Sequence, residues 1–146
     1  MRTSRLLVIS FGLLGLTAGM SVLAGEKLVL IEHALTDHIT DLPPKGDSAG
    51  DLLTFANPVF LSDDKTQIGR DQGYCVRVAA GRSWECLWTL RLEDGQITVQ
   101  GPFDDAADTD LAITGGTGKY AGARGSMHLH ARDAKGSAYD FIYTLR

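Results

Sequence analysis

The chain has 146 residues, with 14 Lys and Arg against 18 Asp and Glu, and it contains two cysteines. Its net charge of −4, without a basic stripe, argues against nucleic acid as a partner. The length suits a single domain with a hydrophobic core of its own.

The first 24 residues have the pattern of a secretory signal peptide. Arg2 and Arg5 precede an almost uninterrupted apolar run over residues 6–16, and the small residues that a signal peptidase prefers end at Ala24. The run is too short for a comfortable membrane span. Cleavage would remove two arginines and no acid, which changes the net charge from −4 to −6. We therefore predict a secreted or periplasmic domain over residues 25–146, with no membrane attachment after cleavage.

Residues 27–145 alternate between polar and apolar in the manner of β-strands, without long helical periodicity. We predict eight strands, at Lys27–His33, Asp51–Asn57, Gly73–Ala79, Ser83–Glu93, Gln96–Gln100, Thr109–Thr114, Ser126–Arg132 and Ser137–Leu145. Residues with turn chemistry separate them at Ala80-Gly81, Asp94-Gly95, Gly101-Pro102 and Ala134-Lys135-Gly136. The segment His38–Gly50, with its two prolines, is predicted to be a loop. Eight strands in one domain of this size indicate a sandwich or a closed barrel.

The stretch ITGGTGKYAGARG, Ile113–Gly125, is the densest run of glycine. A phosphate-binding P-loop needs Gly at position 113, where the chain has Ile, and Ser or Thr after Lys119, where it has Tyr. Residues Gly116–Ala121 fit the looser dinucleotide pattern, but that pattern is informative only where it opens a helix. Because two strands are predicted after it, we expect a glycine-supported reversal between strands and no nucleotide cofactor.

Four motifs in their order resemble the allene oxide cyclase family: GDLLTFAN at Gly50–Asn57, QGYCV at Gln72–Val76, ITVQGPF at Ile97–Phe103 and LAITGGTG at Leu111–Gly118. The segment Gly115–Gly125 also resembles the related dirigent proteins. The resemblance extends from about Leu28 to Leu145. It implies an all-β fold, a small eight-stranded antiparallel closed barrel with a central apolar cavity, commonly assembled as a homotrimer.

The plant cyclases of this family close an unstable unsaturated epoxide, made from a fatty-acid hydroperoxide, into a cyclopentenone. The cavity folds the substrate, excludes water and places polar groups against developing charge. The resemblance implies that Glu32 faces the positive charge, that Asn57 helps to hold the epoxide or oxyanion through water, and that Cys75 acts on the alkene geometry. Ala34 and Phe103 stand where the plant pattern has Asn and Tyr, so two hydrogen-bonding groups of that pattern are missing.

Strand periodicity gives an independent prediction for Glu32. In a strand, Leu28, Leu30 and Glu32 share one face. A carboxylate on an apolar face is costly, and burial would raise its pKa. Alternatively, Glu32 lies at the strand end and reaches solvent. The resemblance favours the functional interpretation.

The two cysteines are predicted to form a disulfide. The Ala80-Gly81 turn sets a register in which residue numbers sum to 161, which places Cys75 directly opposite Cys86. Two facing cysteines in an exported protein favour a bridge. A bridged Cys75 has no thiol for the catalytic role that the resemblance implies, so the structural role is the stronger prediction.

A second set of residues is predicted to contact substrate. Trp84 and Trp88 share an inward face, where they either fill the core or line a ligand site together with Phe103. Arg77 lies on the same face. It would either meet a ligand carboxylate or stack on Trp84 with its guanidinium group at the rim.

No metal site is predicted. His128 and His130 lie on one strand face, but the spacing identifies no third ligand and a cationic neighbour follows, so we expect a solvated outer face. The acidic residues Asp104, Asp105, Asp108 and Asp110 lack the spacing of a calcium loop and are expected in a solvated turn.

Two classes of function follow from the sequence. The first is an exported isomerase or cyclase that acts on a small apolar substrate, derived from a lipid or a phenolic compound, by confinement and electrostatics. The second is a non-catalytic barrel that binds a lipophilic molecule or, like a dirigent protein, steers a reaction. A barrel filled by Trp84, Trp88 and Phe103 would exclude both classes.

Overall fold

The structure is a computed structural model that describes residues 25–146, so the predicted signal peptide lies outside the described residues. The described chain forms ten strands: β1 (Lys27–His33), β2 (His38–Thr40), β3 (Leu52–Phe55), β4 (Pro58–Leu61), β5 (Gln67–Ala79), β6 (Ser83–Leu92), β7 (Gly95–Asp104), β8 (Thr109–Gly118), β9 (Gly125–Ala131) and β10 (Ala138–Leu145). In this part of the chain no helix is long and apolar enough to cross a membrane.

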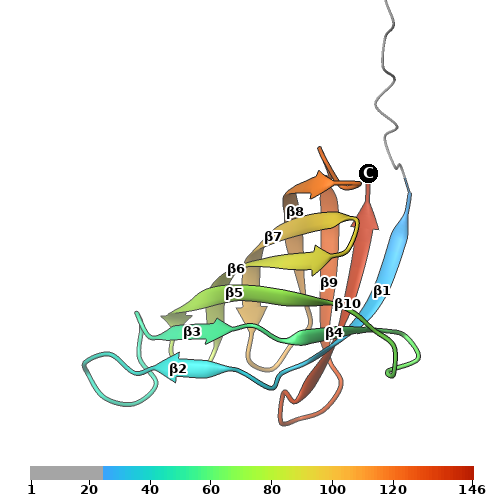
Figure 1. The fold of residues 1–146 in the computed structure, drawn as a ribbon. Helices are drawn as coiled ribbons and strands as arrows, with labels where there is room; N and C mark the ends of the chain where they lie inside the picture. Colours follow the sequence, from blue (N-terminus) through green and yellow to red (C-terminus); the bar gives the residue numbers. More distant parts are fainter. Residues whose placement is uncertain (1–24) are drawn as a thin grey trace, which may run out of the picture.

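The strands form one antiparallel sheet that closes on itself (Figure 1). The sheet order is β2-β3-β5-β4-β1-β10-β9-β8-β7-β6, and a further pairing between β5 and β6 completes the ring. Eight strands, β1 and β4 to β10, make the barrel, while β3 pairs with β5 and β2 pairs with the outer edge of β3. The prediction of an all-β, eight-stranded antiparallel barrel is confirmed.

Strands β3 and β4 behave as one strand with a break. Both pair with the same edge of β5, β3 through Gly73–Val76 and β4 through Gln67–Arg70. The break between them contains Ala56 and Asn57. Since the chain leaves regular pairing here, the backbone and side chain of Asn57 are available for contacts inside the barrel.

Several predicted boundaries were wrong. The segment His38–Gly50 contains the short strand β2, and β4 together with residues 67–72 of β5 was missed. Gly101 and Pro102 continue β7 instead of forming a turn. Pro102 lies beyond the last residue pair between β7 and β8, so β7 is an edge on that side, where proline is tolerated.

The predicted register of the β5–β6 hairpin is confirmed. Cys75 pairs with Cys86 and Arg77 with Trp84, as a residue sum of 161 requires. An irregularity after Arg77 then shifts the register, so that Ala79 pairs with Ser83 next to the turn. Trp88 lies opposite Gly73, where an added Cβ would lie 2.7 Å from the Cα of Trp88. Glycine at that position therefore lets β5 approach the backbone and Cβ of Trp88 closely.

The glycine run forms a strand and a turn, without a helix. Gly115–Gly118 pair with β7, so β8 is longer than predicted, and residues 119–124 make the reversal into β9. A Cβ at Gly116 would lie 2.6 Å from the carbonyl oxygen of Gln96. Close backbone approach and the left-handed conformation of Gly118, with φ of 60°, explain the glycines without a phosphate ligand.

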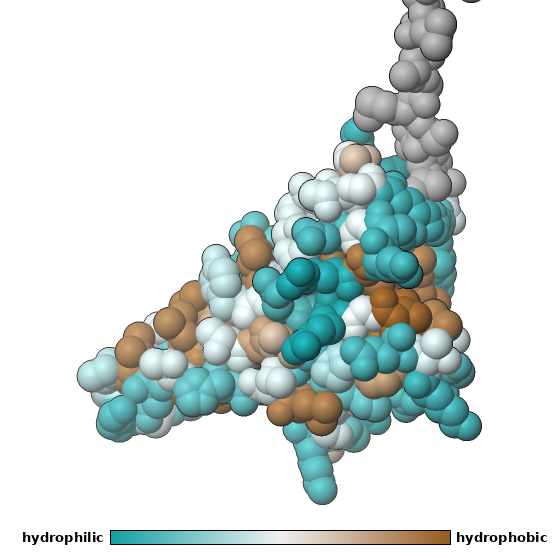
Figure 2. Space-filling view, in the orientation of Figure 1, coloured by the Kyte–Doolittle hydropathy of each residue, from teal (hydrophilic) through white to brown (hydrophobic). Residues whose placement is uncertain are grey.

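The barrel interior holds the hydrophobic core, and some apolar side chains remain outside it. Inward residues of every barrel strand contribute, including Leu30, Trp88, Ile97, Met127 and Tyr143. On the outer face of β5, Tyr74 and Val78 are 49% and 55% exposed. Figure 2 shows apolar residues at the surface on the side of the molecule where β3 and β5 lie.

Candidate functional site

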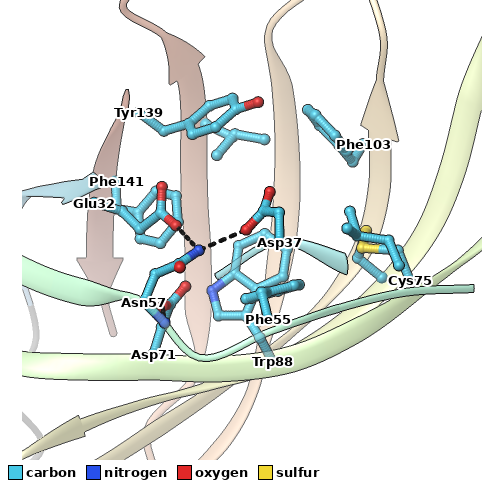
Figure 3. Close-up of a pocket in the computed structure, with 13 residues that line it drawn as sticks. Glu32, Asp37, Phe55, Asn57, Asp71, Cys75, Trp88, Phe103, Tyr139 and Phe141 are labelled. Carbon is cyan, nitrogen blue, oxygen red and sulfur yellow. Dashed lines mark hydrogen bonds between the residues drawn. A yellow bond between two sulfur atoms is a disulfide. The ribbon is translucent and has the colours of Figure 1, made fainter. Parts of the chain in front are cut away.

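One cavity opens into the barrel interior and combines acidic and aromatic residues (Figure 3). Its empty volume, which includes the open mouth, is about 370 Å³. It is therefore a narrow slot, at the lower end of ligand-site sizes. Its lining residues are Glu32, Asp37, Leu53, Phe55, Asn57, Asp71, Cys75, Cys86, Trp88, Phe103, Leu129, Tyr139 and Phe141.

Glu32 points into this slot from β1. The alternation of β1 places it inward together with Leu30, and it is 3% exposed. Burial, followed by the charges of Asp71 and Asp37, raises the pKa of Glu32 to about 9, although the Asn57 hydrogen bond opposes the rise. At neutral pH the Glu32 carboxyl therefore keeps its proton. In this protonated form the Glu32 carboxyl can donate a hydrogen bond and act as an acid. It becomes an anion only after it has lost that proton.

Asn57 connects the acidic residues. Its Oδ1 accepts hydrogen bonds from the backbone N–H groups of Leu35 at 3.0 Å and Thr36 at 2.9 Å. These donors fix the orientation of the amide, so Nδ2 faces the carboxyls. Nδ2 donates to Glu32 Oε1 and, at 2.8 Å, to Asp37 Oδ1 (Figure 3). Asp37 lies in the loop after β1 and is exposed at the cavity mouth.

Asp71 is held on the other side of Asn57. The backbone N–H of Asn57 donates to Asp71 Oδ1 at 3.2 Å, and the N–H of Asp71 donates to the Asn57 carbonyl at 3.0 Å. Asp71 is 0% exposed. Burial raises its pKa to about 7, against the lowering effect of the backbone hydrogen bonds. Asp71 therefore changes charge near neutrality.

Aromatic rings form the walls of the slot. Trp88 stacks with Phe141 at 5.5 Å between ring centroids and meets the edge-on ring of Phe55 at 6.0 Å. Phe103 and Tyr139 form a second edge-to-face pair at 5.9 Å. Burial raises the pKa of Tyr139 to about 12, so its phenol stays protonated. Such walls suit a flat, apolar ligand.

The predicted Cys75–Cys86 disulfide is present. Both cysteines are buried and line the slot. With its sulfur in the bridge, Cys75 offers the cavity a disulfide edge in place of the thiol that the resemblance implied. A disulfide is also compatible with an extracellular protein.

The predicted substrate-binding residues divide into two groups. Trp88 and Phe103 line the slot, whereas Arg77 and Trp84 do not belong to its lining. The Arg77 guanidinium stacks on Trp84, 3.9 Å from the ring centroid, which is the second of the two arrangements predicted for it. The Arg77 Nη1 donates a hydrogen bond to Asp105 Oδ1 at 2.6 Å. The Arg77 Nε lies 2.7 Å from Asp47 Oδ1 and forms an ion pair with it, although the angle of this contact is not that of a hydrogen bond. Arg77 thus ties two loops to the barrel.

The histidines lie on the outer face of β9. His128 Nδ1 contacts Asp110 at 2.9 Å, and His130 Nδ1 contacts Asp108 at the same distance. Both pairs are solvent-accessible. Within residues 25–146, no group of three or more His, Cys, Asp or Glu is arranged to hold a metal ion.

Asp37 and Asp71 are the site residues that sequence reasoning missed, together with Phe55, Tyr139 and Phe141. A signal for Asp71 existed: continuing the alternation back from Cys75 through Gly73 places Asp71 on the inward face. The segment was not recognised as strand because of its glycine and charged residues. Asp37 comes from a loop, where no periodicity applies.

Comparisons with known proteins agree with this fold. Among solved structures, a pyocyanin demethylase is similar at 24% identity over 81% of this chain and all of its own, with a TM-score of 0.69. A pterocarpan synthase dirigent protein follows at 17% identity over 82% of both chains, with a TM-score of 0.67. The Diels-Alderase of Streptomyces koyangensis is 17% identical over 84% of this chain and 69% of its own, with a TM-score of 0.64.

At these identities the structures establish the fold alone. The sequence profile described as "Allene oxide cyclase barrel like domain" matches residues 31–142, which is most of the described chain. The resemblance predicted from the four sequence motifs is therefore confirmed, and the chain belongs to the allene oxide cyclase-like barrel family.

Proposed function

We propose that the protein is an isomerase or cyclase that takes a small, flat, largely apolar substrate into the slot and activates it with the Glu32 carboxyl. The observation that carries this proposal is the position of that carboxyl. It is buried among aromatic rings, its Oε1 accepts a hydrogen bond from Asn57, and its Oε2 has no hydrogen-bond partner among the described residues. Buried polar atoms are normally paired, so Oε2 is available to a substrate.

The chemistry follows from the protonation state. Because Oε1 accepts the Asn57 N–H, the acidic proton of Glu32 belongs on Oε2. A substrate carbonyl or epoxide oxygen accepts that proton or its hydrogen bond, which makes the adjoining carbons electron-poor. The carboxylate formed on transfer then stabilises positive charge that spreads over the substrate, as do the surrounding ring faces. Ring closure or double-bond migration needs no other reactant.

The lining also limits the class of substrate. Among the described residues that line the slot, three are acidic and none is Lys, Arg or His. An anionic group inside the slot would be unpaired and repelled, so the substrate part that enters is neutral or carries positive charge during the reaction. The stacked aromatic rings of its walls favour a flat group over a bulky one. We therefore propose a compact ring system or short polyene.

The alternative is a barrel that binds and steers without catalysis. The absence of hydrogen-bonding side chains at Ala34 and Phe103 favours it, because a steering protein needs shape more than polar groups. Similar structures include both a dirigent protein and a Diels-Alderase. The fold is thus compatible with either class, and the buried Glu32 is the reason to prefer catalysis. We further propose that the protein is exported and forms a homotrimer. The signal pattern and the disulfide support export, and the family resemblance supports the trimer.

The test separates binding from turnover. Trp88 faces the slot, so in a Trp84→Phe background its fluorescence reports entry of flat apolar compounds. Compounds retained by the native protein, identified by mass spectrometry, are then assayed for turnover. Glu32→Gln preserves size and a donor at the Oε2 position but cannot give up a proton. We expect binding to remain and turnover to fall by about tenfold or more.

Glu93→Gln, at an exposed turn position, serves as the control and should match the unmodified protein. Equal turnover by Glu32→Gln would eliminate the catalytic proposal in favour of a binding or steering barrel.

A further inference from the structure

We infer that Asp71 is a second catalytic carboxyl, which works with Glu32 as an acid–base pair organised by Asn57. The inference rests on the proposed function, since it assigns a partner to the acid described there. It extends that function because it specifies the reaction as proton transposition: one carboxyl adds a proton to the substrate while the other removes one.

The pairing is visible in the hydrogen bonds of Asn57. Its side-chain Nδ2 donates to Glu32 Oε1, and its backbone N–H donates to Asp71 Oδ1 at 3.2 Å. Each carboxyl thus has one oxygen fixed by the same residue. The other oxygen of each, Glu32 Oε2 and Asp71 Oδ2, is buried and has no hydrogen-bond partner among the described residues. Both residues line the slot (Figure 3).

A purely structural role would not require a carboxylate at position 71. The contact with Asn57 uses only Oδ1 as an acceptor, and an asparagine amide would supply the same acceptor without a buried ionisable group. Burying an ionisable group is costly and needs compensation. Two slot-lining carboxyl oxygens, Glu32 Oε2 and Asp71 Oδ2, are nevertheless buried without a hydrogen-bond donor among the described residues. The polar atoms at this end of the slot therefore exceed what packing needs.

The proton balance of the step closes. Glu32 gives its Oε2 proton to a substrate oxygen, and Asp71 Oδ2 takes a proton from a neighbouring C–H. The electron pair of that C–H bond forms the new C=C bond of an enol. In a substrate with a further double bond this enol is a dienol, so Asp71 returns the proton to the far carbon, the double bond moves, and Glu32 recovers the oxygen proton. The substrate is isomerised, the pair regains its original protons, and no oxidant or other reactant is used.

Repulsion between the two carboxyls makes the pair suitable for this exchange. The charge of Asp71 contributes to the raised pKa of Glu32, after the effect of burial. Asp37 adds to both, while Arg70 acts in the opposite direction on Asp71. Ionisation of one carboxyl therefore favours protonation of the other, which is the condition for one acid and one base at the same pH.

Carboxyl ¹³C NMR tests the pair without any substrate. In protein labelled at the Asp and Glu carboxyl carbons, Glu32 and Asp71 are followed from pH 4 to pH 10, with each signal assigned by substitution. In Asp71→Asn we expect the Glu32 midpoint to fall by about one pH unit or more, because a like charge has been removed. Asp37→Asn, at the cavity mouth, should have a smaller effect. An unchanged Glu32 titration in Asp71→Asn would overturn the inference.

Catalysis by the pair is tested with 2-tetralone, a flat, neutral, enolisable ketone. Exchange of its C1 hydrogens in D₂O is followed by ¹H NMR, and its binding by Trp88 fluorescence. We expect Glu32→Gln and Asp71→Asn each to slow exchange by about 100-fold while binding persists, with the double variant no slower than either single variant. Partial rescue by Asp71→Glu would support a base at this position.

The outcomes distinguish the two claims. Fast exchange by Asp71→Asn together with slow exchange by Glu32→Gln overturns the pair and leaves Glu32 as a single acid. A wild-type protein that binds 2-tetralone but exchanges it no faster than Asp71→Asn also overturns the pair. Failure to bind any flat apolar compound counts instead against the proposed function.

Discussion

The buried Glu32 carboxyl makes the stability of the folded protein depend on pH in an unusual direction. Its pKa rises from 4.5 to about 9 on folding, so between these values the native state holds a proton that the unfolded chain has released. The free energy of unfolding therefore falls as pH increases through this window. One proton of difference corresponds to about 1.4 kcal/mol per pH unit.

Glu32→Gln removes this dependence while keeping the shape of the side chain. The Gln carbonyl accepts the Asn57 hydrogen bond, and the amide group replaces the acid O–H. Relative to wild type, the variant should gain stability as pH rises, by about 4 kcal/mol between pH 5.5 and pH 8.5. Asp71, whose pKa is also raised, is retained in both proteins, so the comparison reports on Glu32 together with its coupling to Asp71.

Urea unfolding at pH 5.5, 7.0 and 8.5, followed by tryptophan fluorescence, measures the effect. Glu93→Gln is the matched control and should run parallel to wild type. If the stability difference between Glu32→Gln and wild type is the same at every pH, Glu32 ionises normally in the folded protein. The acid assigned to the slot would then not exist.

Three further predictions concern the framework. Replacing both Cys75 and Cys86 with Ala should lower the free energy of unfolding by about 2–3 kcal/mol, because the bridge closes a short loop; if both thiols of exported protein are alkylated without reductant, the bridge is absent. Gly116→Ala should destabilise the barrel by about 2 kcal/mol or more, because the added Cβ would meet backbone oxygen atoms. Gly115→Ala, which has open space around the added Cβ, should not destabilise it. Equal melting temperatures for the two variants would contradict this. The exposed apolar residues on β5 and the family resemblance predict a trimer, so light scattering should give three times the monomer mass, and Val78→Asp should reduce it; a monomeric wild type would refute it.

Strand periodicity predicted much of the barrel because one face of each strand is buried. The alternation in β1 placed Glu32 inward, and the turn at Ala80-Gly81 set the register that joins Cys75 to Cys86. These features depend on near neighbours in the sequence or across one hairpin. Such local rules, together with the family resemblance, are sufficient to identify the barrel class and one of its buried acids, Glu32.

The rest of the site depends on contacts that periodicity does not encode. Asn57 lies in a break between two strands, and its orientation is set by backbone donors from the loop that contains Asp37. The prediction missed Asp71 because β5 begins at Gln67, six residues before the predicted start at Gly73. The alternation of this longer strand places the Asp71 side chain inward. The width of the slot depends on how Phe55, Trp88 and Phe141 pack, which is a property of the closed barrel.

The most direct test of the central claim is a comparison of molecular mass before and after turnover. Small molecules retained by the native protein are incubated with wild type, Glu32→Gln and Glu93→Gln, and the products are analysed by chromatography with high-resolution mass spectrometry. An isomerase or cyclase converts a retained compound into a product with the same molecular formula, and Glu32→Gln loses that conversion while Glu93→Gln keeps it. A product of different formula, or equal conversion by Glu32→Gln, would contradict the account.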